Sequence, residues 1–397
     1  MQLTPRDAVL QFGQVLQQQL FPHLEAAVGR LTPQLELLAA VVSLVPLGRS
    51  LSARRARTGR PAKDRAALAT AFMAKAIFNL PTTRDLLDRL RVDQALRQFC
   101  GWRSLHSLPH ESKFSRAFAE FASTQLPQQL HQAVIQATQS QRLVGHIARD
   151  STAIRARERV PEEVMEKKRA AKKRVQERKN KPRQRKPGKG SFAKAKASER
   201  GKRLQRQPHQ TLERMLADLS QQCDIGSKTN SQGHEHYWRG YKLHLDVADG
   251  QVPISAILTS ASVHDSQVAI PLMTMTSARV THLYELMDSA YDADGIVAHS
   301  RKLNHVPIVA PNRRRGSRKV SQLPKALPGE AAPELTWAQE ERFKERTMIE
   351  RVNGRLKDEF GANQVRVRGA AKVMAHLMFG VLALTVDQWL RLGRIQL

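Results

Sequence analysis

The amino-acid sequence predicts an α/β domain, a sheet flanked by helices, preceded by an all-α N-terminal domain. Up to about residue 145, apolar residues recur at helical spacing. Beyond that point, segments of β-favouring residues alternate with helical segments, as in "GHIARDSTAI" and "HVPIVAPN". A further helical stretch ends the chain. We therefore predict one domain over residues 1–145 and a second over residues 146–397.

The N-terminal domain is expected to contain a helix, a tight turn and a second helix. The segment "KDRAALATAFMAKAIFNL" is followed by "PTTRDLLDRLRVDQALRQF", in which Thr82 or Thr83 can cap the second helix. The first helix places small and apolar side chains near one face, at Ala67, Leu68, Ala71, Ala74 and Ile77. Such a pair is typical of helix-turn-helix DNA-binding domains, although amphipathic helix pairs are common in many proteins.

Strand signals dominate the first part of the second domain. Asp150 lies in "GHIARDSTAI", a predicted strand in which Asp is an unusual residue. "YKLHLDVADGQVPISAILTSAS" alternates on both sides of Asp249 and Gly250, which predicts a β-hairpin. "VHDSQVAIPLMTMTS" is expected to be helical. "HLYELMDSAYD" is expected to be a strand that ends at Asp288, and "HVPIVAPN" one more strand.

A basic insertion separates the first strand from the hairpin, from Arg155 to about residue 210. Its low complexity and central Pro and Gly residues predict a solvated loop, an arm that binds phosphates without sequence preference, or a segment that is both. The whole chain is also basic, because 65 Lys and Arg residues against 36 Asp and Glu give a formal charge of 65 − 36 = +29 over 397 residues. This excess favours nucleic acid as the partner, and a membrane surface is the weaker candidate.

Cysteine usage and hydropathy favour the cytoplasm. Cys100 and Cys223 are far apart in the sequence and do not have the spacing of metal ligands. The first residues lack a signal-peptide pattern. The most apolar stretches, "LELLAAVVSLVPL" and "VMAHLMFGVLALTV", are shorter than the roughly 20 residues of a membrane span. We expect a cytoplasmic, nucleoid-associated protein without a membrane partner.

One long helix is predicted from Trp337 to Phe360. Thr336 and Gln339 form a capping-box pattern at its start, and Gly361 suits its end. At 1.5 Å per residue this helix would be about 36 Å long. Apolar residues at helical spacing form its buried face: Ile349, Val352, Leu356 and Phe360. A second set recurs on another face: Phe343, Arg346, Glu350 and Lys357.

The carboxylates Asp150, Asp288 and Glu350 together suggest phosphoryl transfer on nucleic acid. An exposed glutamate between Arg346 and Lys357 could simply form weak surface ion pairs. However, two divalent ions held by a few carboxylates can activate the attacking oxygen and stabilise the leaving oxygen of a phosphodiester. Magnesium prefers oxygen ligands, and manganese is a possible substitute. The flanking basic side chains would then hold phosphates near the cleaved bond.

Other residues near these positions have weaker claims. Asp292 and Asp294 are close to Asp288 in sequence, but Asp288 directly follows the apolar strand pattern and is preferred. His264 with Asp265 could lie near the metals, although capping the following helix explains the aspartate as well. Trp337 could stack on an unpaired base, but packing in the core is the simpler expectation.

The spacing of Phe343, Arg346, Glu350 and Lys357 is similar to the Tyr-Arg-Glu-Lys signature of bacterial insertion-sequence DDE transposases. "HIARDSTAI" resembles the strand that carries the first aspartate of that family, and "LYELMDSAYDADGI" the region of the second. "YKLHLDVADG" and "TSASVHDSQVAIPLM" resemble the segment between them. "GRPAKDRAALATAFMAKAIFNLPTTRDLLDRL" and "LPHESKFSRAF" are similar to the helical domain that precedes the catalytic core. Phe replaces the signature Tyr, so its phosphate hydrogen bond would be lost.

The resemblance implies a ribonuclease H-like core with Asp150 on the first strand, Asp288 after the fourth and Glu350 on a late helix. These acids would bind two Mg²⁺ ions, and Arg346 and Lys357 would contact DNA. The implied activity is cleavage at the ends of an insertion sequence, followed by transfer of the 3′-hydroxyl into target double-stranded DNA. Because two ends must be brought together, a homodimer on DNA is expected.

Two other functions are compatible with the sequence. A DNA nuclease that cuts without joining could use the same acids, although the long N-terminal domain favours a protein that recognises particular ends. A DNA-binding regulator with a vestigial site is the alternative from another class. The three intact acids argue against it.

Overall fold

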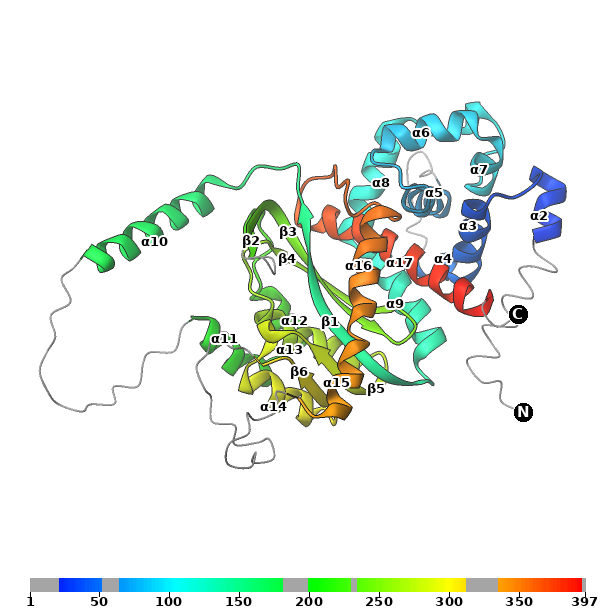
Figure 1. Ribbon diagram of the computed structural model, residues 1–397. Coiled ribbons are helices and arrows are strands. Elements are labelled where there is room, and N and C mark those ends of the chain that lie inside the picture. The colour runs from blue at the N-terminus through cyan, green and yellow to red at the C-terminus, as the bar shows by residue number, and fades with distance from the viewer. Residues whose placement is uncertain (1–20, 52–63, 181–198, 230–233, 312–334, 395–397) are drawn as a thin grey trace, which may run out of the picture.

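The computed structural model describes residues 21–51, 64–180, 199–229, 234–311 and 335–394. A twisted sheet lies at the centre of the molecule, with the N-terminal helices on one side and a group of later helices around its other end (Figure 1). The predicted fold class, a mixed sheet flanked by helices after a helical N-terminal region, is confirmed.

The N-terminal region is wholly helical in its described part. Its helices are α2 (Phe21–Val28), α3 (Pro33–Leu44), α4 (Leu47–Ser50), α5 (Arg65–Ile77), α6 (Thr83–Val92), α7 (Gln94–Phe99), η2 (Leu105–Ser107), α8 (Glu111–Ser123) and α9 (Leu126–Gln139). Thr82 caps α6, because its side chain accepts from the Asp85 amide and the Asp85 carboxylate accepts in return. Helix α5 is buried from Ala67 to Ile77, so it is the central core helix of this region.

The sheet combines antiparallel and parallel strands. Its strands are β1 (Leu143–Arg155), β2 (Asp224–Thr229), β3 (Glu235–Ala248), β4 (Val252–Ser260), β5 (Thr281–Met287) and β6 (Val306–Val309). Strand β3 pairs antiparallel with β1, β2 and β4, whereas β5 pairs parallel with β1 and with β6. The hairpin predicted around Asp249 and Gly250 is confirmed as β3 and β4. Asp288 was expected after the fourth strand, but β5, the strand that precedes it, is the fifth along the chain because β2 forms ahead of the hairpin.

The remaining helices surround this sheet. They are α10 (Glu162–Asn180), α11 (Glu199–Arg206), η3 (Gln207–His209), α12 (Leu212–Ala217), α13 (Ser266–Ser277), η4 (Ser289–Tyr291), α14 (Asp294–Lys302), α15 (Trp337–Lys344), α16 (Thr347–Asp358) and α17 (Ala370–Arg394). Helix α16 packs on β1 and β3. Its apolar face is buried as predicted, at Ile349, Val352 and Leu356, and Phe360, two residues after the end of the helix, is buried as well.

Helix α17 connects the two predicted domains. It packs against α3, α5, α8 and α9 of the N-terminal region and also against β4. By length and composition it could cross a membrane, but 72% of its apolar window is buried inside the protein. A buried core helix can have the same length and apolar composition. A single hydrophobic cluster therefore runs from the N-terminal helices into the sheet.

The single helix predicted from Trp337 to Phe360 is wrong, because the structure has two. Around Glu345 and Arg346 the backbone tightens into bonds between residues three apart, including Arg346 N–H to the Phe343 carbonyl at 3.0 Å. The capping box of Thr336 and Gln339 is confirmed, and Gly361 has the left-handed φ of +83° expected after a helix end.

The basic insertion contains helices that we did not anticipate from its sequence. Residues 181–198 lie outside the described part, but α10 and α11 flank them. Figure 1 shows α10 extending away from the body of the molecule. In the first half of this helix, Lys168 forms an ion pair with Asp224 at 2.6 Å and donates a hydrogen bond to the Ile225 carbonyl. Both partners belong to β2, at the edge of the sheet. Farther along α10, Arg169, Lys173 and Glu177 are exposed.

Candidate active site

Two of the predicted acids lie at the same level on adjacent strands. Strands β1 and β5 run parallel, and their register pairs Arg149 with Met287. The next residues along the two strands are Asp150 and Asp288. Asp150 lies within the central strand, where side chains alternate between the faces of the sheet. Asp288 follows β5 and caps the short helix η4, since its side chain accepts from the Ala290 amide at 2.9 Å. Parallel pairing therefore brings together residues 138 positions apart.

Both aspartates lie in surroundings that disfavour their charge. Burial raises the pKa of Asp150 to about 6, although Arg346 and Lys228 oppose this shift and the charge of Asp288 adds to it. Burial also raises the pKa of Asp288, where Arg346 and Lys228 again oppose it. Carboxyl groups whose pKa is raised by burial in a groove are typical of functional sites.

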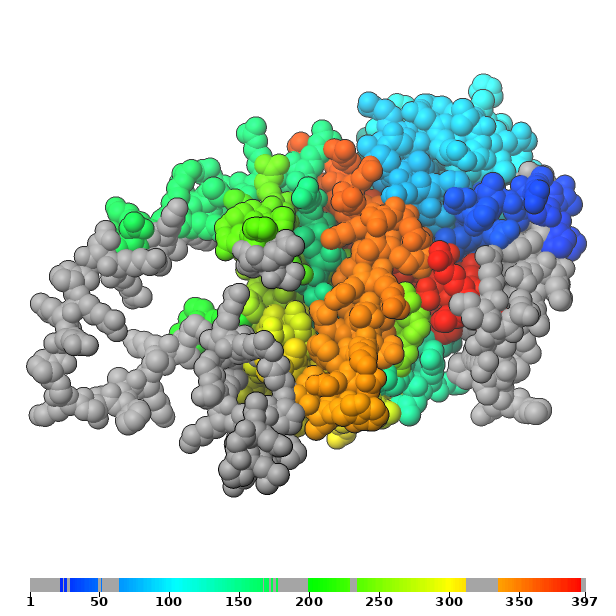
Figure 2. Space-filling view, viewed as in Figure 1, coloured from blue at the N-terminus to red at the C-terminus, as the bar shows by residue number. Residues whose placement is uncertain are grey.

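Arg346 links Glu350 to Asp150. The Arg346 guanidinium lies 2.8 Å from the Glu350 carboxylate and 3.6 Å from that of Asp150. The Glu350 side chain is 58% exposed, whereas that of Arg346 is 16% exposed. The two residues are one turn apart at the start of α16, so the helix places both at the edge of the site. Figure 2 shows the orange α15 and α16 segment on the visible face of the molecule.

A groove of about 810 Å³ lies over the two aspartates. Its lining includes Asp150, Ser151, Lys228, Lys242, Asp265, Asp288 and Lys357. Lys357 comes from α16, Lys228 from β2 and Lys242 from β3, so three segments supply positive charge to one space. Burial and the nearby Lys228 lower the pKa of Lys357. This combination of acids beneath and basic groups around the groove suits a phosphodiester bound with metal ions.

Asp265 lines the groove, although its sequence position was explained equally well by capping of the following helix. It stands at the start of α13, but its side chain makes no capping hydrogen bond there. Instead it lies 2.9 Å from the Lys242 ammonium and lines the groove with Asp150 and Asp288. Burial alone would raise the pKa of Asp265, but His244 and Lys242 lower it on balance. The capping explanation is therefore not supported, and the charge of Asp265 helps to raise the pKa of Asp288.

The donor set of the groove fits hard divalent cations. Asp150 and Asp288 offer carboxylate oxygens at one level of the sheet, whereas Glu350 does not line the groove and is connected to Asp150 through Arg346, which contacts both carboxylates. Magnesium and manganese prefer such oxygen ligands. Asp292 and Asp294, the rivals of Asp288, are not among the residues that line the groove.

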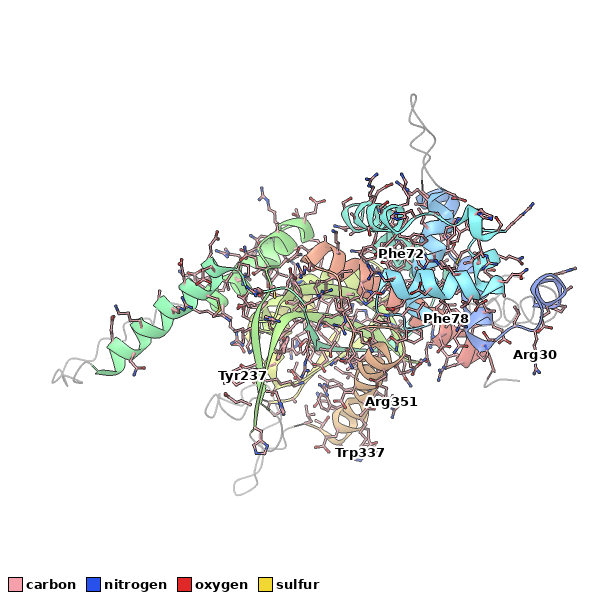
Figure 3. The ribbon with its side chains drawn as sticks, turned by 90° about the horizontal axis from the view of Figure 1, so that it is seen from above. Arg30, Phe72, Phe78, Tyr237, Trp337 and Arg351 are labelled. Atoms are coloured by element: carbon pink, nitrogen blue, oxygen red, sulfur yellow. The ribbon has the colours of Figure 1, made fainter. Side chains whose placement is uncertain are left out.

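Two exposed aromatic side chains lie near this face. Trp337 is 77% exposed and Tyr237 is 64% exposed. Figure 3 shows both on the same side of the molecule as Arg351 of α16. The expectation that Trp337 packs in the core is wrong, because the first turn of α15 presents it to solvent. Phe343, at the position of the signature tyrosine, is partly buried against the main hydrophobic cluster.

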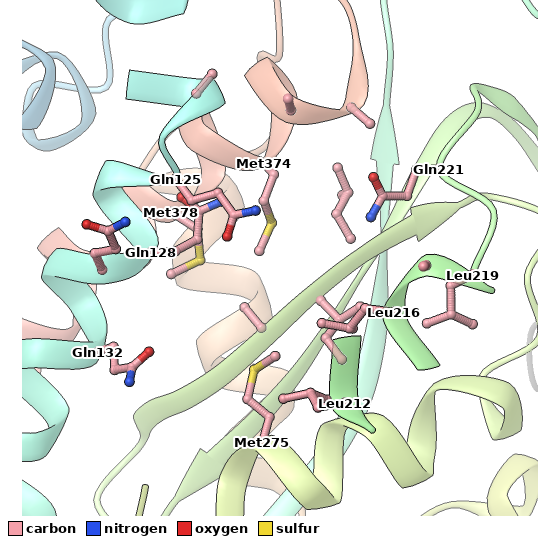
Figure 4. Close-up of a pocket in the computed structure, with 18 of the residues that line it drawn as sticks. Gln125, Gln128, Gln132, Leu212, Leu216, Leu219, Gln221, Met275, Met374 and Met378 are labelled. Atoms are coloured by element: carbon pink, nitrogen blue, oxygen red, sulfur yellow. The ribbon is translucent and has the colours of Figure 1, made fainter. Parts of the chain in front are cut away.

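A second hollow, of about 720 Å³, contains none of the predicted acids. It lies between the α8–α9 region, α12, β4, α13 and α17. Figure 4 shows its glutamines, including Gln125, Gln128 and Gln132, opposite methionines and leucines such as Met374 and Leu216. Without acids or a cluster of basic groups, this hollow is not a candidate for phosphoryl transfer.

Comparison with known families adds two matches. Residues 145–386 match the family described as "Transposase DDE domain". Residues 23–120 match the family described as "Transposase domain (DUF772)". No curated protein and no solved structure matches the chain. The first match includes the three predicted acids and both basic residues of the late helix.

Proposed function

Because the chain belongs to the insertion-sequence DDE transposases and is therefore a DNA transposase that uses divalent metal, we propose that Asp150, Asp288 and Glu350 are its metal ligands. The supporting observation is the parallel register of β1 and β5, which sets Asp150 beside Asp288, with Arg346 linking Asp150 to Glu350. Two Mg²⁺ ions bound there would activate the attacking oxygen and stabilise the leaving oxygen of the phosphodiester.

The basic residues around the groove hold the DNA backbone. Lys357 and Lys228 line the space above the aspartates, where a phosphate can reach them. Arg346 contacts Asp150 and Glu350, and its guanidinium would be available to a phosphate where bound cations balance those carboxylates. These residues position the scissile phosphate by charge-assisted hydrogen bonds, whereas the acids hold the metal.

Cleavage exposes a 3′-hydroxyl, which the same site then joins to target DNA. The site is open at the surface, as the exposed Glu350 side chain indicates, so a second DNA segment can reach the acids. The N-terminal helical domain, residues 1–145, recognises transposon ends, and residues 146–397 catalyse. Within the first domain, α6 follows the buried α5 and exposes several arginines, as the second helix of a helix-turn-helix would.

Two further features follow from this activity. A homodimer on DNA brings the two ends together, and the protein acts in the cytoplasm on the nucleoid. Light scattering of the complex with end DNA tests the dimer. A single protomer per paired set of ends would contradict it.

The test of the proposed activity is a cleavage and joining assay with Mg²⁺ on a supercoiled plasmid that carries the DNA ends flanking this gene. Wild type is compared with Glu350→Gln and with Glu345→Gln, an exposed glutamate five residues earlier. We expect wild type and Glu345→Gln to cut and join, and Glu350→Gln to bind DNA equally but do neither. Cutting without joining by wild type would indicate a nuclease. Activity retained by Glu350→Gln would refute the assigned role of this glutamate.

A further inference from the structure

A cluster of two histidines and a glutamate is buried in the sheet, outside the groove. His282 and Glu285 belong to β5, and His305 immediately precedes β6. His282 is 2% exposed, Glu285 0% and His305 8%. The His282 Nε2 atom lies 3.3 Å from Glu285 Oε1, and His305 Nδ1 lies 3.6 Å from the same oxygen. Both imidazoles are therefore directed at one carboxylate in a site closed to bulk water.

One buried arginine lies between two buried carboxylates beside this cluster, and burial raises the pKa of one of them, Asp246. Arg149 is fully buried and contacts two carboxylates, Asp246 at 2.7 Å and Glu285 at 3.3 Å. Thr276 donates a further hydrogen bond to Asp246 at 2.6 Å. One fixed positive charge thus serves two buried carboxylates. Burial disfavours the charge of Glu285, yet Arg149 and the two histidines hold its pKa well below the usual range, so it is ionised.

Several polar atoms of the cluster lack partners within the described part of the chain. Glu285 Oε2 and His282 Nδ1 are buried and accept or donate no hydrogen bond there. Buried polar groups are normally satisfied, so each exception needs an explanation. The centroids of the two imidazole rings also lie only 3.6 Å apart, with the ring planes tilted by 32°. A close pair of histidines around an ionised carboxylate is costly unless a cation or a proton joins them.

The spacing of the donor atoms matches a metal site. One nitrogen from each histidine and one Glu285 oxygen all lie within 4.8 Å of one another. In a tetrahedral zinc site with bonds of about 2.0–2.2 Å, neighbouring ligand atoms are roughly 3.3–3.5 Å apart. The observed 3.3 and 3.6 Å distances are close to that range. Two nitrogens and one carboxylate favour zinc or a similar transition metal, unlike the all-oxygen set of the groove.

We propose that His282, Glu285 and His305 bind one divalent transition-metal ion of the zinc class. The unpartnered Glu285 Oε2 can complete the coordination as a second oxygen from the same carboxylate. The ion supplies the positive charge that Arg149 alone does not provide. It joins the residue just before β6 to β5 at Glu285, three residues before Asp288, and so fixes the strand that leads to this aspartate. Its role is structural, since the buried site is closed to substrate.

The test measures metal content in a full-length protein whose catalytic acids are removed, Asp150→Asn with Asp288→Asn. This background keeps the result independent of the proposed DNA cleavage. We expect one zinc per chain after dialysis, and replacement by Co²⁺ to give the intense visible absorption of four-coordinate cobalt. Six-coordinate cobalt in an all-oxygen site absorbs only weakly.

Substitutions then locate the ion. His305→Asn is expected to lose the bound zinc and lower the unfolding midpoint, whereas His305→Cys, which keeps a metal-binding side chain, retains the zinc. His376→Gln is the matched control, because His376 is also buried but bonds to the Gly361 carbonyl in another part of the molecule. The proposal would be overturned if the parent protein contained no zinc. It would also be overturned if His305→Asn left the zinc content unchanged. A folded, zinc-free protein stabilised by acid would instead show that a proton joins the two histidines.

Discussion

Lys75 is a buried ammonium whose replacement should stabilise the protein. It lies on the core helix α5 with 6% of its surface exposed. Its Nζ atom has no hydrogen-bond partner among the described residues. Burial lowers the pKa of Lys75 from 10.5 to about 8, although Asp85 opposes the shift. The folded protein therefore holds this charge at a cost at neutral pH.

The size of the effect follows from the shift in pKa. The fall in the pKa of Lys75 from 10.5 to about 8 corresponds to at most about 3.5 kcal/mol, at roughly 1.4 kcal/mol for each pKa unit. Between pH 8 and 10.5 the unfolded chain keeps its proton while the folded protein releases it. The free energy of unfolding should therefore rise with pH through this interval. Below pH 8 both states are protonated and the penalty is complete.

Lys75→Met keeps the length and helix propensity of the side chain while removing the charge. We expect it to raise the free energy of unfolding by about 2–3 kcal/mol at pH 7, with a smaller gain at pH 10. Urea unfolding at both pH values measures this. Lys113→Met is the matched control, since Lys113 is exposed on α8. A destabilised Lys75→Met protein, or an equal gain at both pH values, would refute the reasoning.

Other predictions concern DNA. Lys357→Met should reduce cleavage by about 10²-fold, because one group that stabilises charge on the phosphate is lost; an unchanged single-turnover rate would exclude this role. Replacing the exposed Arg169 and Lys173 of α10 by Gln should make the plot of log affinity against log salt shallower by roughly 2, if both contact phosphates; an unaltered slope in a salt titration would show that α10 does not bind DNA. Trp337→Ala should leave the unfolding midpoint unchanged, because this side chain is 77% exposed, and should weaken binding to end DNA with unpaired bases by about 1–3 kcal/mol. If Trp337→Ala binds end DNA with unpaired bases as tightly as wild type does, Trp337 does not stack on those bases.

The sequence by itself determined the local elements of this protein. The β-favouring segments predicted the strand of Asp150 and the strand before Asp288, and the N-cap candidates Thr82 or Thr83 and the capping box of Thr336 predicted where helices begin. The buried face of α16 followed from its spacing of apolar residues. These signals depend on neighbours within about four residues, so they can be recognised without knowledge of the fold. The family resemblance added the order in which the acids occur.

Only the tertiary structure decided which distant groups meet. The parallel register of β1 and β5 sets Asp150 beside Asp288, and Asp265 enters the same groove because Lys242, on another strand, holds it there. The break between α15 and α16 occurs at Arg346, whose guanidinium reaches Asp150 on the central strand. No local spacing encodes such contacts.

The same reason explains the unforeseen positions of helix α17 and the buried cluster. Helix α17 returns to the N-terminal helices because its apolar surface needs partners on several sides. His282, Glu285 and His305 come together because two parallel strands align them, with no short sequence motif linking all three. Burial and ion pairing depend on which segments pack together across the chain. Those choices are made by the whole fold rather than by local sequence.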